Sequence, residues 1–429
     1  MPSAKTNAMK TLIRNASVVL PEGTLQTSVL IDGGQIAAID PAIHTQAETV
    51  VDAAGLHLIP GVIDDQVHFR EPGLTHKEDL RHASRACAKG GVTTFLDMPN
   101  TTPNTTTQTR LDEKLTLAAQ RSLVNYGFYI GATPDNLEEL KQAQRTPGIK
   151  IFIGSSTGDL LVDDQDALER IFGETSLPIC AHCEDESIVR ANQRRYAASH
   201  DVADHSRIRD REAAVVSTCR ALDLAFRHQH RFHVLHVSTG AEADLAADHR
   251  GLITAEVCPH HLFFSIDDYP RLGTLVQMNP SVKTKADGAH LWQALLDGRV
   301  QVVATDHAPH ARTDKEVEFE YASSGISGLE TSLALSIALV NEGVITWDKL
   351  AEKMSSNPAR ILSLSKGTLA PGADADITVI DPQVKWTVNV KDFRSRGKNS
   401  PFGGRSLQGR ALLTIVGGEI KYCAPSFKL

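Results

Sequence analysis

Short apolar runs rich in β-branched residues alternate with amphipathic segments of helical length along the middle of the chain. This alternation is typical of β-α units on a parallel sheet, where each buried strand is followed by a crossover helix. Eight such units favour an α/β fold of the closed (β/α)8 TIM-barrel type over a doubly wound sheet. We count eight runs, at residues 56–63, 92–97, 126–132, 149–153, 177–182, 232–237, 252–257 and 300–305. Helices are expected between or after them, for example at residues 77–89, 110–121, 184–198, 241–248 and 329–341.

The two ends of the chain have a different pattern, of short strands separated by glycine-containing turns. Neither end has enough strands for a stable core of its own. We therefore expect one small β-sandwich domain built from both termini, residues 1–58 and 366–429, beside a barrel domain of residues 59–365. The terminal strands are expected at residues 12–20, 28–32, 35–39, 375–380, 386–390 and 411–416.

The charge of the chain argues against a nucleic-acid partner. Its 44 basic and 52 acidic side chains give a net charge of −8, and no basic block could neutralise several phosphates. No apolar stretch has the length of a secretory signal or a membrane span, and the 6 cysteines form no paired CxxC pattern. We therefore expect a cytoplasmic protein with free thiols and no membrane association.

Side chains that can bind metals recur where the expected strands end. His68 follows the first run, His182 ends the fifth, His236 lies in the sixth and Asp306 follows the eighth. Each histidine alone would fit a buried structural residue, but barrel enzymes assemble their sites at the carboxyl ends of the strands. Neutral imidazoles and carboxylates are ligands of zinc, which activates water for hydrolysis. The pattern predicts a zinc-dependent hydrolytic centre that acts on a small molecule.

Two longer motifs resemble those of a known family. Residues 64–72 read DDQVHFREP, which is similar to the first signature of the dihydroorotases, and residues 304–310 read ATDHAPH, followed by Lys315, which fits their second signature. The chain thus resembles the dihydroorotases, cyclic amide hydrolases of the metal-dependent amidohydrolase superfamily, over nearly its whole length. Further likeness lies at residues 97–101, 279–281, 356–360 and 367–376.

The resemblance implies a centre of one or two zinc ions. His68 and Asp306 would hold one ion, His182 and His236 would hold the other, and an N6-carboxylated Lys150 would bridge them. Carboxylation suits two close cations because it turns a cationic amine into an anionic oxygen donor. A solvated strand lysine is the alternative for Lys150, and the apolar residues that follow it favour the bridge.

One position departs from the family pattern. Gln66 stands where the family has its first metal-binding histidine, and an amide oxygen is a poorer zinc ligand than an imidazole. Three outcomes stay open for the site of His68 and Asp306: it binds metal weakly, it uses the Gln66 oxygen, or it stays empty while the other site is filled.

For the substrate, the resemblance assigns Arg70, Asn100 and His310 to a carboxylate and Asn279 to the edge of a ring amide. A guanidinium offers a planar fork to a carboxylate, so an anionic cyclic amide would be held in one orientation. An ordinary surface ion pair is the alternative for Arg70, and its place two residues after His68 disfavours that reading.

Small and hydroxyl-bearing residues follow the fourth run, at residues 154–158. Ser156 and Thr157 in this segment are our hypothesis for a mobile lid that closes on the substrate. A plain β-α turn fits the segment equally well.

The reaction that the resemblance implies is the reversible cyclisation of N-carbamoyl-L-aspartate to L-dihydroorotate in de novo pyrimidine (UMP) biosynthesis. In the hydrolytic direction a metal-activated hydroxide would attack the ring carbonyl, with Asp306 as the proton carrier. One alternative is a hydantoinase- or allantoinase-like cyclic amidase, whose substrates lack the carboxylate. Another is an inactive homologue that is the structural partner of another pyrimidine-pathway enzyme, a reading that Gln66 alone motivates. We expect a homodimer, because dimers are common among oligomers.

Overall fold

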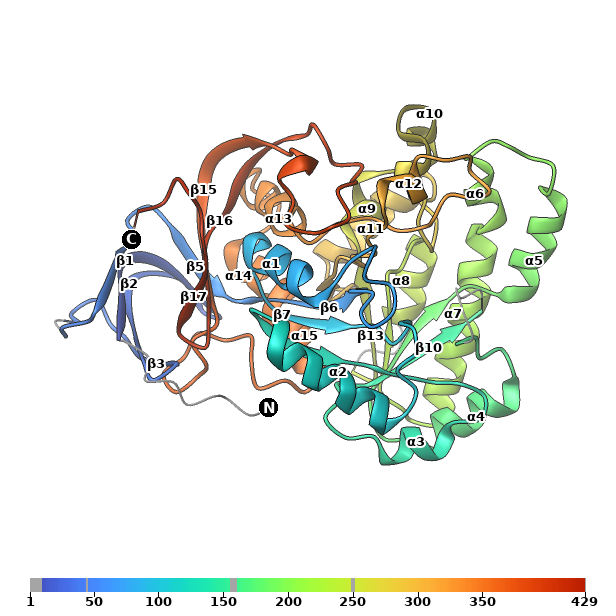
Figure 1. Cartoon of the computed structure of the whole chain (residues 1–429), viewed down its shortest axis with the longest axis horizontal. Helices are drawn as coiled ribbons and strands as arrows, with labels where there is room; N and C mark the ends of the chain where they lie inside the picture. Colours follow the sequence, from blue (N-terminus) through green and yellow to red (C-terminus); the bar gives the residue numbers. More distant parts are fainter. Residues whose placement is uncertain (1–9, 44, 155–159, 248–250, 429) are drawn as a thin grey trace.

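The computed structural model describes residues 10–43, 45–154, 160–247 and 251–428. It has two parts (Figure 1): a sheet made from both ends of the chain lies on the left, and parallel strands surrounded by helices lie on the right. The two segments that flank the barrel in the sequence therefore meet in space, as the pattern of strands at both ends predicts.

The barrel strands run parallel and follow one another in chain order, in two arcs. The arcs join where β9 follows β8 after a single residue, and a parallel bridge from Val67 to His307 links their other ends. The expected (β/α)8 order is thereby confirmed. The strands are β6 (Val62–Val67), β7 (Val92–Asp97), β8 (Asn125–Phe128), β9 (Ile130–Gly131), β10 (Ile149–Ile153), β11 (Ile179–Cys183), β12 (Phe232–Val234), β13 (Ile253–Val257) and β14 (Val302–Val303).

Helices cover the outside of these strands, and local signals set their ends. The first begins after Asp79, whose side chain accepts from the His82 backbone N–H, and it ends at Gly91 with a φ of 86°. The longer helices are α1 (Leu80–Gly90), α2 (Gln108–Arg121), α4 (Gln165–Glu174), α5 (Glu186–Arg195), α7 (Arg211–Arg227), α8 (Gly240–Ala247), α11 (Lys285–Leu296) and α13 (Ser332–Asn341). The shorter ones are α3 (Leu137–Gln142), α6 (Asp204–Ile208), α9 (Pro259–Phe263), α10 (Tyr269–Leu272), α12 (Arg312–Lys315), α14 (Trp347–Ala351) and α15 (Asn357–Ile361).

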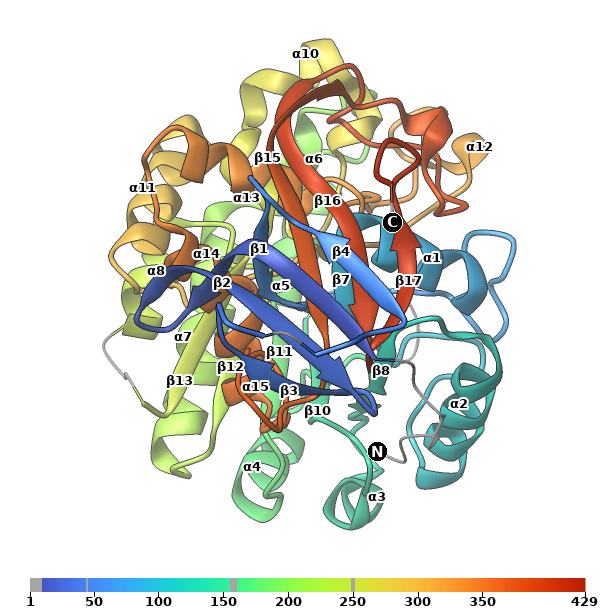
Figure 2. The same cartoon turned by 90° about the vertical axis from the view of Figure 1, so that its left-hand side faces the viewer.

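The terminal sheet is continuous across the two ends of the chain (Figure 2). Its strand order is β17-β16-β15-β5-β1-β2-β3, and β4 also pairs with β1. Apolar side chains from both ends share one buried cluster, which explains why neither end needs a core of its own. The strands are β1 (Thr11–Leu20), β2 (Gly23–Asp32), β3 (Gln35–Ile39), β4 (Thr49–Asp52), β5 (His57–Pro60), β15 (Ile377–Thr387), β16 (Ser406–Val416) and β17 (Glu419–Cys423).

Two strand predictions need correction. The run at residues 56–63 is not one barrel strand, because β5 pairs with β1 and β15 in the terminal sheet and β6 starts the barrel only at Val62. Gly61 separates them, and a Cβ there would lie 2.1 Å from Thr93 Oγ1. The strand expected at residues 386–390 ends at Thr387 as part of β15, and a 3-10 turn at Val390–Asp392 follows it.

Specific contacts fix the terminal sheet to the barrel. Thr378 Oγ1 donates to the carbonyl of Gly91 at 2.6 Å, and Thr414 Oγ1 donates to that of Ala88 at 2.6 Å. Helix α13 also packs against β16. The sheet therefore braces the end of α1, while the carboxyl ends of the barrel strands stay free for a site. Among the described helices, none has the length and apolarity to cross a membrane.

Candidate active site and metal centre

A cavity of about 480 Å³ lies at the carboxyl ends of the barrel strands. The structure brings into its lining every described residue that the sequence analysis assigned to metal or substrate. The hypothetical lid residues Ser156 and Thr157 lie outside the described residues. The assigned residues in the lining are His68, Arg70, Asn100, Lys150, His182, His236, Asn279, Asp306 and His310, joined by Gln66.

Four ligand atoms form two close pairs in this cavity. His182 Nδ1 lies 3.1 Å from His236 Nε2, and His68 Nε2 lies 3.1 Å from Asp306 Oδ1. Burial lowers the pKa of His182 and, more strongly, that of His236, so both imidazoles are neutral near pH 7. Neutral imidazoles whose nitrogens converge in this way are suited to hold a cation.

Neighbouring residues set the ring orientation of two of these histidines. Asn100 Oδ1 lies 2.7 Å from His68 Nδ1, so Nδ1 donates to it and Nε2 keeps its lone pair for the cavity. Glu184 Oε2 lies 2.9 Å from His182 Nε2, which leaves Nδ1 of that ring as the ligand atom. Asn100 thus has a positioning contact that the sequence analysis did not assign to it.

Glu184 is the site residue that sequence reasoning missed. It is fully buried and also accepts from Arg209. Burial would raise the pKa of Glu184, but Arg209 and His182 beside it bring the pKa below its ordinary range, so the carboxylate is ionised. A signal existed, because residues i and i+2 of a strand share a face and Glu184 is two positions after His182.

Removal of the Glu184 charge should weaken metal binding at His182. We expect Glu184→Gln to lower the metal affinity of the centre roughly 10- to 100-fold, because the amide no longer makes the ring more basic. Chelator competition followed by metal analysis measures this. Glu174→Gln, at an exposed position of α4, is the control. Equal affinities in the two variants would refute the positioning role.

Lys150 lies among the ligands with a buried, unpaired amine. Its Nζ has no hydrogen-bond partner among the described residues and sits 4.4 Å from the centre of the Phe152 ring. Burial lowers the pKa of Lys150 to about 8. A neutral amine is the form that reacts with carbon dioxide, so this environment is suited to a carboxylated lysine.

Gln66 points into the ligand set despite its departure from the family pattern. Its Nε2 donates to Asp306 Oδ1 at 3.3 Å, and its buried Oε1 has no partner within the described part of the chain. Gln66 is 1% exposed, so it occupies the place of a ligand and is not turned to solvent.

Arg70 and His310 form a second group in the same cavity. His310 Nδ1 lies 3.2 Å from Lys77 Nζ, which can only donate, so Nε2 carries the ring proton and donates to the Ser324 carbonyl at 2.9 Å. Burial, with Arg70 beside it, lowers the pKa of His310 and keeps the ring neutral. Arg70 Nη2, 3.1 Å from this protonated Nε2, therefore has no acceptor there and stays available to an anion.

Arg70 remains cationic although it is buried. Its exposed fraction is 8%, and burial lowers its pKa only to about 10. Asn279 reaches the same cavity with a buried Oδ1 that has no partner among residues the structure describes. A buried cation beside unpaired amide groups is suited to bind a carboxylate on a polar ring.

Three residues of the site have a strained backbone. Arg70, His236 and Asp306 have φ values of 64°, 36° and 44°, in the left-handed region that side chains rarely adopt. A strained backbone persists only where the surrounding structure stabilises it. Such residues are common at functional sites, where side chains must have a defined orientation.

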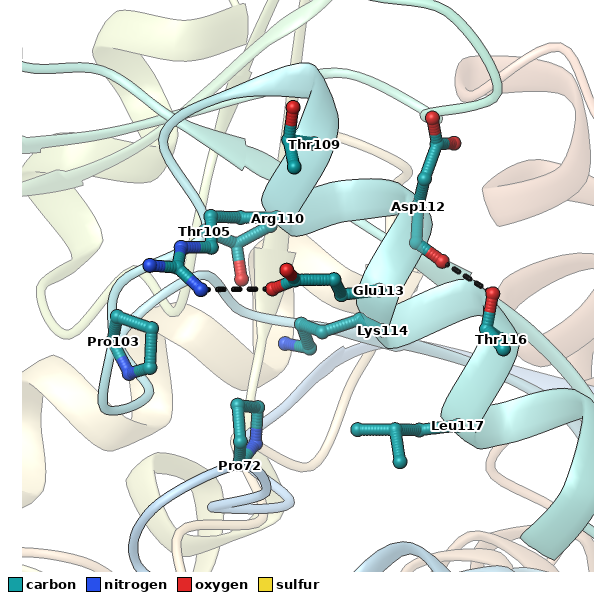
Figure 3. A pocket seen from close by; sticks show the side chains of 10 residues that line it. All are labelled: Pro72, Pro103, Thr105, Thr109, Arg110, Asp112, Glu113, Lys114, Thr116 and Leu117. Atoms are coloured by element: carbon teal, nitrogen blue, oxygen red, sulfur yellow. Dashed lines mark hydrogen bonds and ion pairs between the residues drawn. The ribbon is translucent and has the colours of Figure 1, made fainter.

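A larger hollow of about 670 Å³, beside α2, has none of these ligands in its lining (Figure 3). Arg110 there forms an ion pair with Glu113 at 2.9 Å, and the backbone carbonyl of Asp112 accepts from Thr116 Oγ1 at 2.8 Å. Its lining has no histidine or cysteine. We therefore locate the chemistry in the smaller cavity.

Comparisons with known proteins agree with this geometry. The model of the amidohydrolase family matches residues 57–421. Dihydroorotases of Syntrophus aciditrophicus and Syntrophotalea carbinolica are 36% and 37% identical, each over 96% of this chain and 99% of their own length. The structure of an L-hydantoinase (dihydropyrimidinase) from Arthrobacter aurescens superposes with a TM-score of 0.94 at 30% identity, and the match covers 98% of both chains. A dihydropyrimidinase from Brevibacillus agri gives a TM-score of 0.90 at 25% identity, over 98% of this chain and 96% of its own.

Three observations agree with one another: the strand order, the ligand set at the strand ends, and the sequence matches to known proteins over nearly the whole length. The chain therefore belongs to the amidohydrolase family and, within it, to the sequence group of the dihydroorotases.

Proposed function

We propose that this protein is a dihydroorotase that interconverts N-carbamoyl-L-aspartate and L-dihydroorotate. The observation that carries the proposal is the buried, cationic Arg70 in the same cavity as the ligand set. A cyclic amide bound there must bring an anionic group to Arg70, and the carboxylate of dihydroorotate is such a group.

The cofactor of this proposal is zinc, in one or two sites. His182 Nδ1 and His236 Nε2 would hold one ion, and His68 Nε2 and Asp306 would hold the other, with carboxylated Lys150 between them. Nitrogens 3.1 Å apart suit this, because two ligands of a tetrahedral ion with bonds of about 2.0–2.2 Å lie roughly 3.3–3.6 Å apart. When bound, zinc activates water and polarises the ring carbonyl.

Gln66 completes the site of His68 and Asp306 in this proposal. A half-turn of its amide group would exchange the positions of Oε1 and Nε2. The carbonyl oxygen would then lie where Nε2 lies now, about 3.3 Å from Asp306 Oδ1. Two oxygens repel at that distance unless a cation lies between them. The Gln66 oxygen is therefore our choice among the three outcomes that the sequence left open.

The chain's own groups then have distinct tasks. Asp306 accepts the proton of the attacking water and returns it to the ring nitrogen that leaves. Arg70 and the amide of Asn100 orient the carboxylate, and His310 joins them when its Nε2–H turns from the Ser324 carbonyl to the substrate. Asn279 binds the edge of the ring amide. Ser156 and Thr157 remain our hypothesis for the lid.

A hydantoinase-like activity is the second candidate, and its support is the likeness to the L-hydantoinase structure. L-dihydroorotate and dihydrouracil differ only by the carboxylate, so their rates of ring opening separate the two functions. A dihydroorotase hydrolyses the ring of L-dihydroorotate but not that of dihydrouracil. Faster opening of dihydrouracil would favour the second candidate, and an inability to turn over either ring in the zinc-loaded protein would favour an inactive structural partner.

Arg70 should select for the carboxylate. We expect Arg70→Met to lower kcat/KM for L-dihydroorotate roughly 10- to 150-fold, since charged hydrogen bonds contribute about 1.5–3 kcal/mol. Steady-state kinetics measure the loss, and unchanged zinc content and thermal unfolding show that the centre is intact. A loss confined to kcat would speak against a role in carboxylate binding.

Further parts of the proposal concern organisation. We propose two domains, residues 1–58 with 366–429 and residues 59–365, although β5 spans the first boundary. A homodimer, a cytoplasmic location and association with another pyrimidine-pathway enzyme stay predictions.

A further inference from the structure

A second group of ligand-type side chains is buried inside the barrel. Asp65 on β6, His233 on β12 and Glu256 on β13 have exposed fractions of 0%, 1% and 0%. One ligand atom from each lies within 4.8 Å of the others. His233 Nε2 lies 3.2 Å from Glu256 Oε2 and 3.7 Å from Asp65 Oδ2.

The hydrogen bonds around this group leave its inner atoms facing one another. His233 Nδ1 lies 2.7 Å from Thr254 Oγ1, and Glu256 Oε1 accepts from the backbone N–H of His236 at 3.1 Å. Thus His233 Nε2 and Glu256 Oε2 are both turned toward Asp65. Neither carboxylate oxygen of Asp65 has a hydrogen-bond partner within the described ranges.

No lysine or arginine among the described residues forms an ion pair with either carboxyl group of this site, and His233 is their one charged or polar neighbour in an ion pair there. Two carboxyl groups lie together in the barrel interior, where an uncompensated charge is strongly unfavourable. Lys150 is also near, but its Nζ makes no hydrogen bond to either carboxylate among the described residues. Carboxylation of Lys150, as proposed above, would add a further negative charge.

We propose that Asp65, His233 and Glu256 form a buried binding site for a divalent transition metal ion, with zinc as the ion that their donor set fits. The ligand atoms are His233 Nε2, Glu256 Oε2 and one or both oxygens of Asp65. Bonds of about 2.0–2.2 Å in a tetrahedral site separate ligands by roughly 3.3–3.6 Å, which the observed 3.2 and 3.7 Å bracket.

The site has a structural role toward the cavity above it. Glu256 contacts the buried ion through Oε2 and the His236 backbone through Oε1. His236 has the strained φ of 36°, which the surrounding structure must hold. An ion that fixes Glu256 therefore helps to fix His236. This site is independent of the substrate proposed above, and its test needs no turnover.

The first experiment counts metal ions per chain in the purified full-length protein loaded with zinc. Asp65→Asn keeps the shape of the side chain and loses its charge, and we expect it to bind one zinc fewer than the unaltered protein. His182→Asn, which removes a ligand of the other cavity, should keep the buried ion. An Asp65→Asn variant with the full zinc content would overturn the proposal.

A second measurement covers the case in which the variant does not fold. Anomalous scattering at the zinc edge from crystals of the unaltered protein locates each ion without mutation. We expect a peak within bonding distance of His233 Nε2 and Glu256 Oε2. A map from zinc-loaded crystals with no peak among the three side chains would overturn the proposal. Protons shared between the two carboxyl groups would then neutralise their charge.

Discussion

Asp306→Asn is expected to lower kcat for L-dihydroorotate hydrolysis roughly 10²- to 10⁴-fold, the range that positioned acid-base groups contribute. Asp306 Oδ1 lies 3.1 Å from His68 Nε2 and 3.3 Å from Gln66 Nε2. An amide has nearly the same shape, but it neither accepts a proton nor binds zinc as well as a carboxylate. Steady-state rates in both directions, with zinc measured on the same samples, test this.

The way in which the loss divides between kcat and KM makes the test specific. Asp306 is not assigned to the carboxylate of the substrate, so KM should change much less than kcat. Asp223→Asn is the matched control, because Asp223 pairs with Arg227 at 2.9 Å on the surface of α7 and does not line the cavity. A variant that retains full turnover with its zinc in place would remove Asp306 from the mechanism.

The barrel could be predicted from the sequence because its strands are buried on both faces. The run at residues 149–153 coincides with β10, all five residues of which are buried, and the run at 92–97 coincides with β7. The first run failed for a physical reason. Residues 57–60 are as apolar as a barrel strand, yet they pair in the terminal sheet. Local periodicity cannot predict this, because it does not depend on pairing partners that are distant in the sequence.

The members of the site were predictable for a different reason. A parallel barrel brings all strand ends to one face, so His68 and Asp306 had to approach each other despite their separation in sequence. Their precise partners were not predictable. The contact of Asn100 with His68 depends on side-chain directions that only the folded chain sets. For Glu184, the spacing from His182 indicates a shared face but does not fix the hydrogen bond between the two side chains. The same holds for the buried approach of Asp65 to His233.

Lys150→Ala is expected to remove the bridge that we propose between the two metal sites. Polarisation of a carbonyl by a metal contributes several kcal/mol, so kcat/KM should fall roughly 10²- to 10³-fold or more, together with zinc content. Metal analysis and steady-state kinetics on the same preparation measure both. The contrast with Lys114 supports this choice, since Lys114 Nζ is paired with Asp97 at 2.6 Å. Lys150 has no such partner among the described residues.

Chemical rescue tests whether the bridge is an anion. Lys150→Ala leaves a cavity beside His182 and His236 that a small carboxylate such as propionate can fill, and activity with zinc should then rise. Propylamine, of similar size but opposite charge, is the control. Rescue by propionate alone means that position 150 supplies an anionic oxygen donor, as carboxylated lysine does. Activity that is undiminished in the variant would mean that Lys150 has no role in turnover. Equal restoration by propylamine would mean that Lys150 acts only by filling space, since the two molecules share volume and differ in charge.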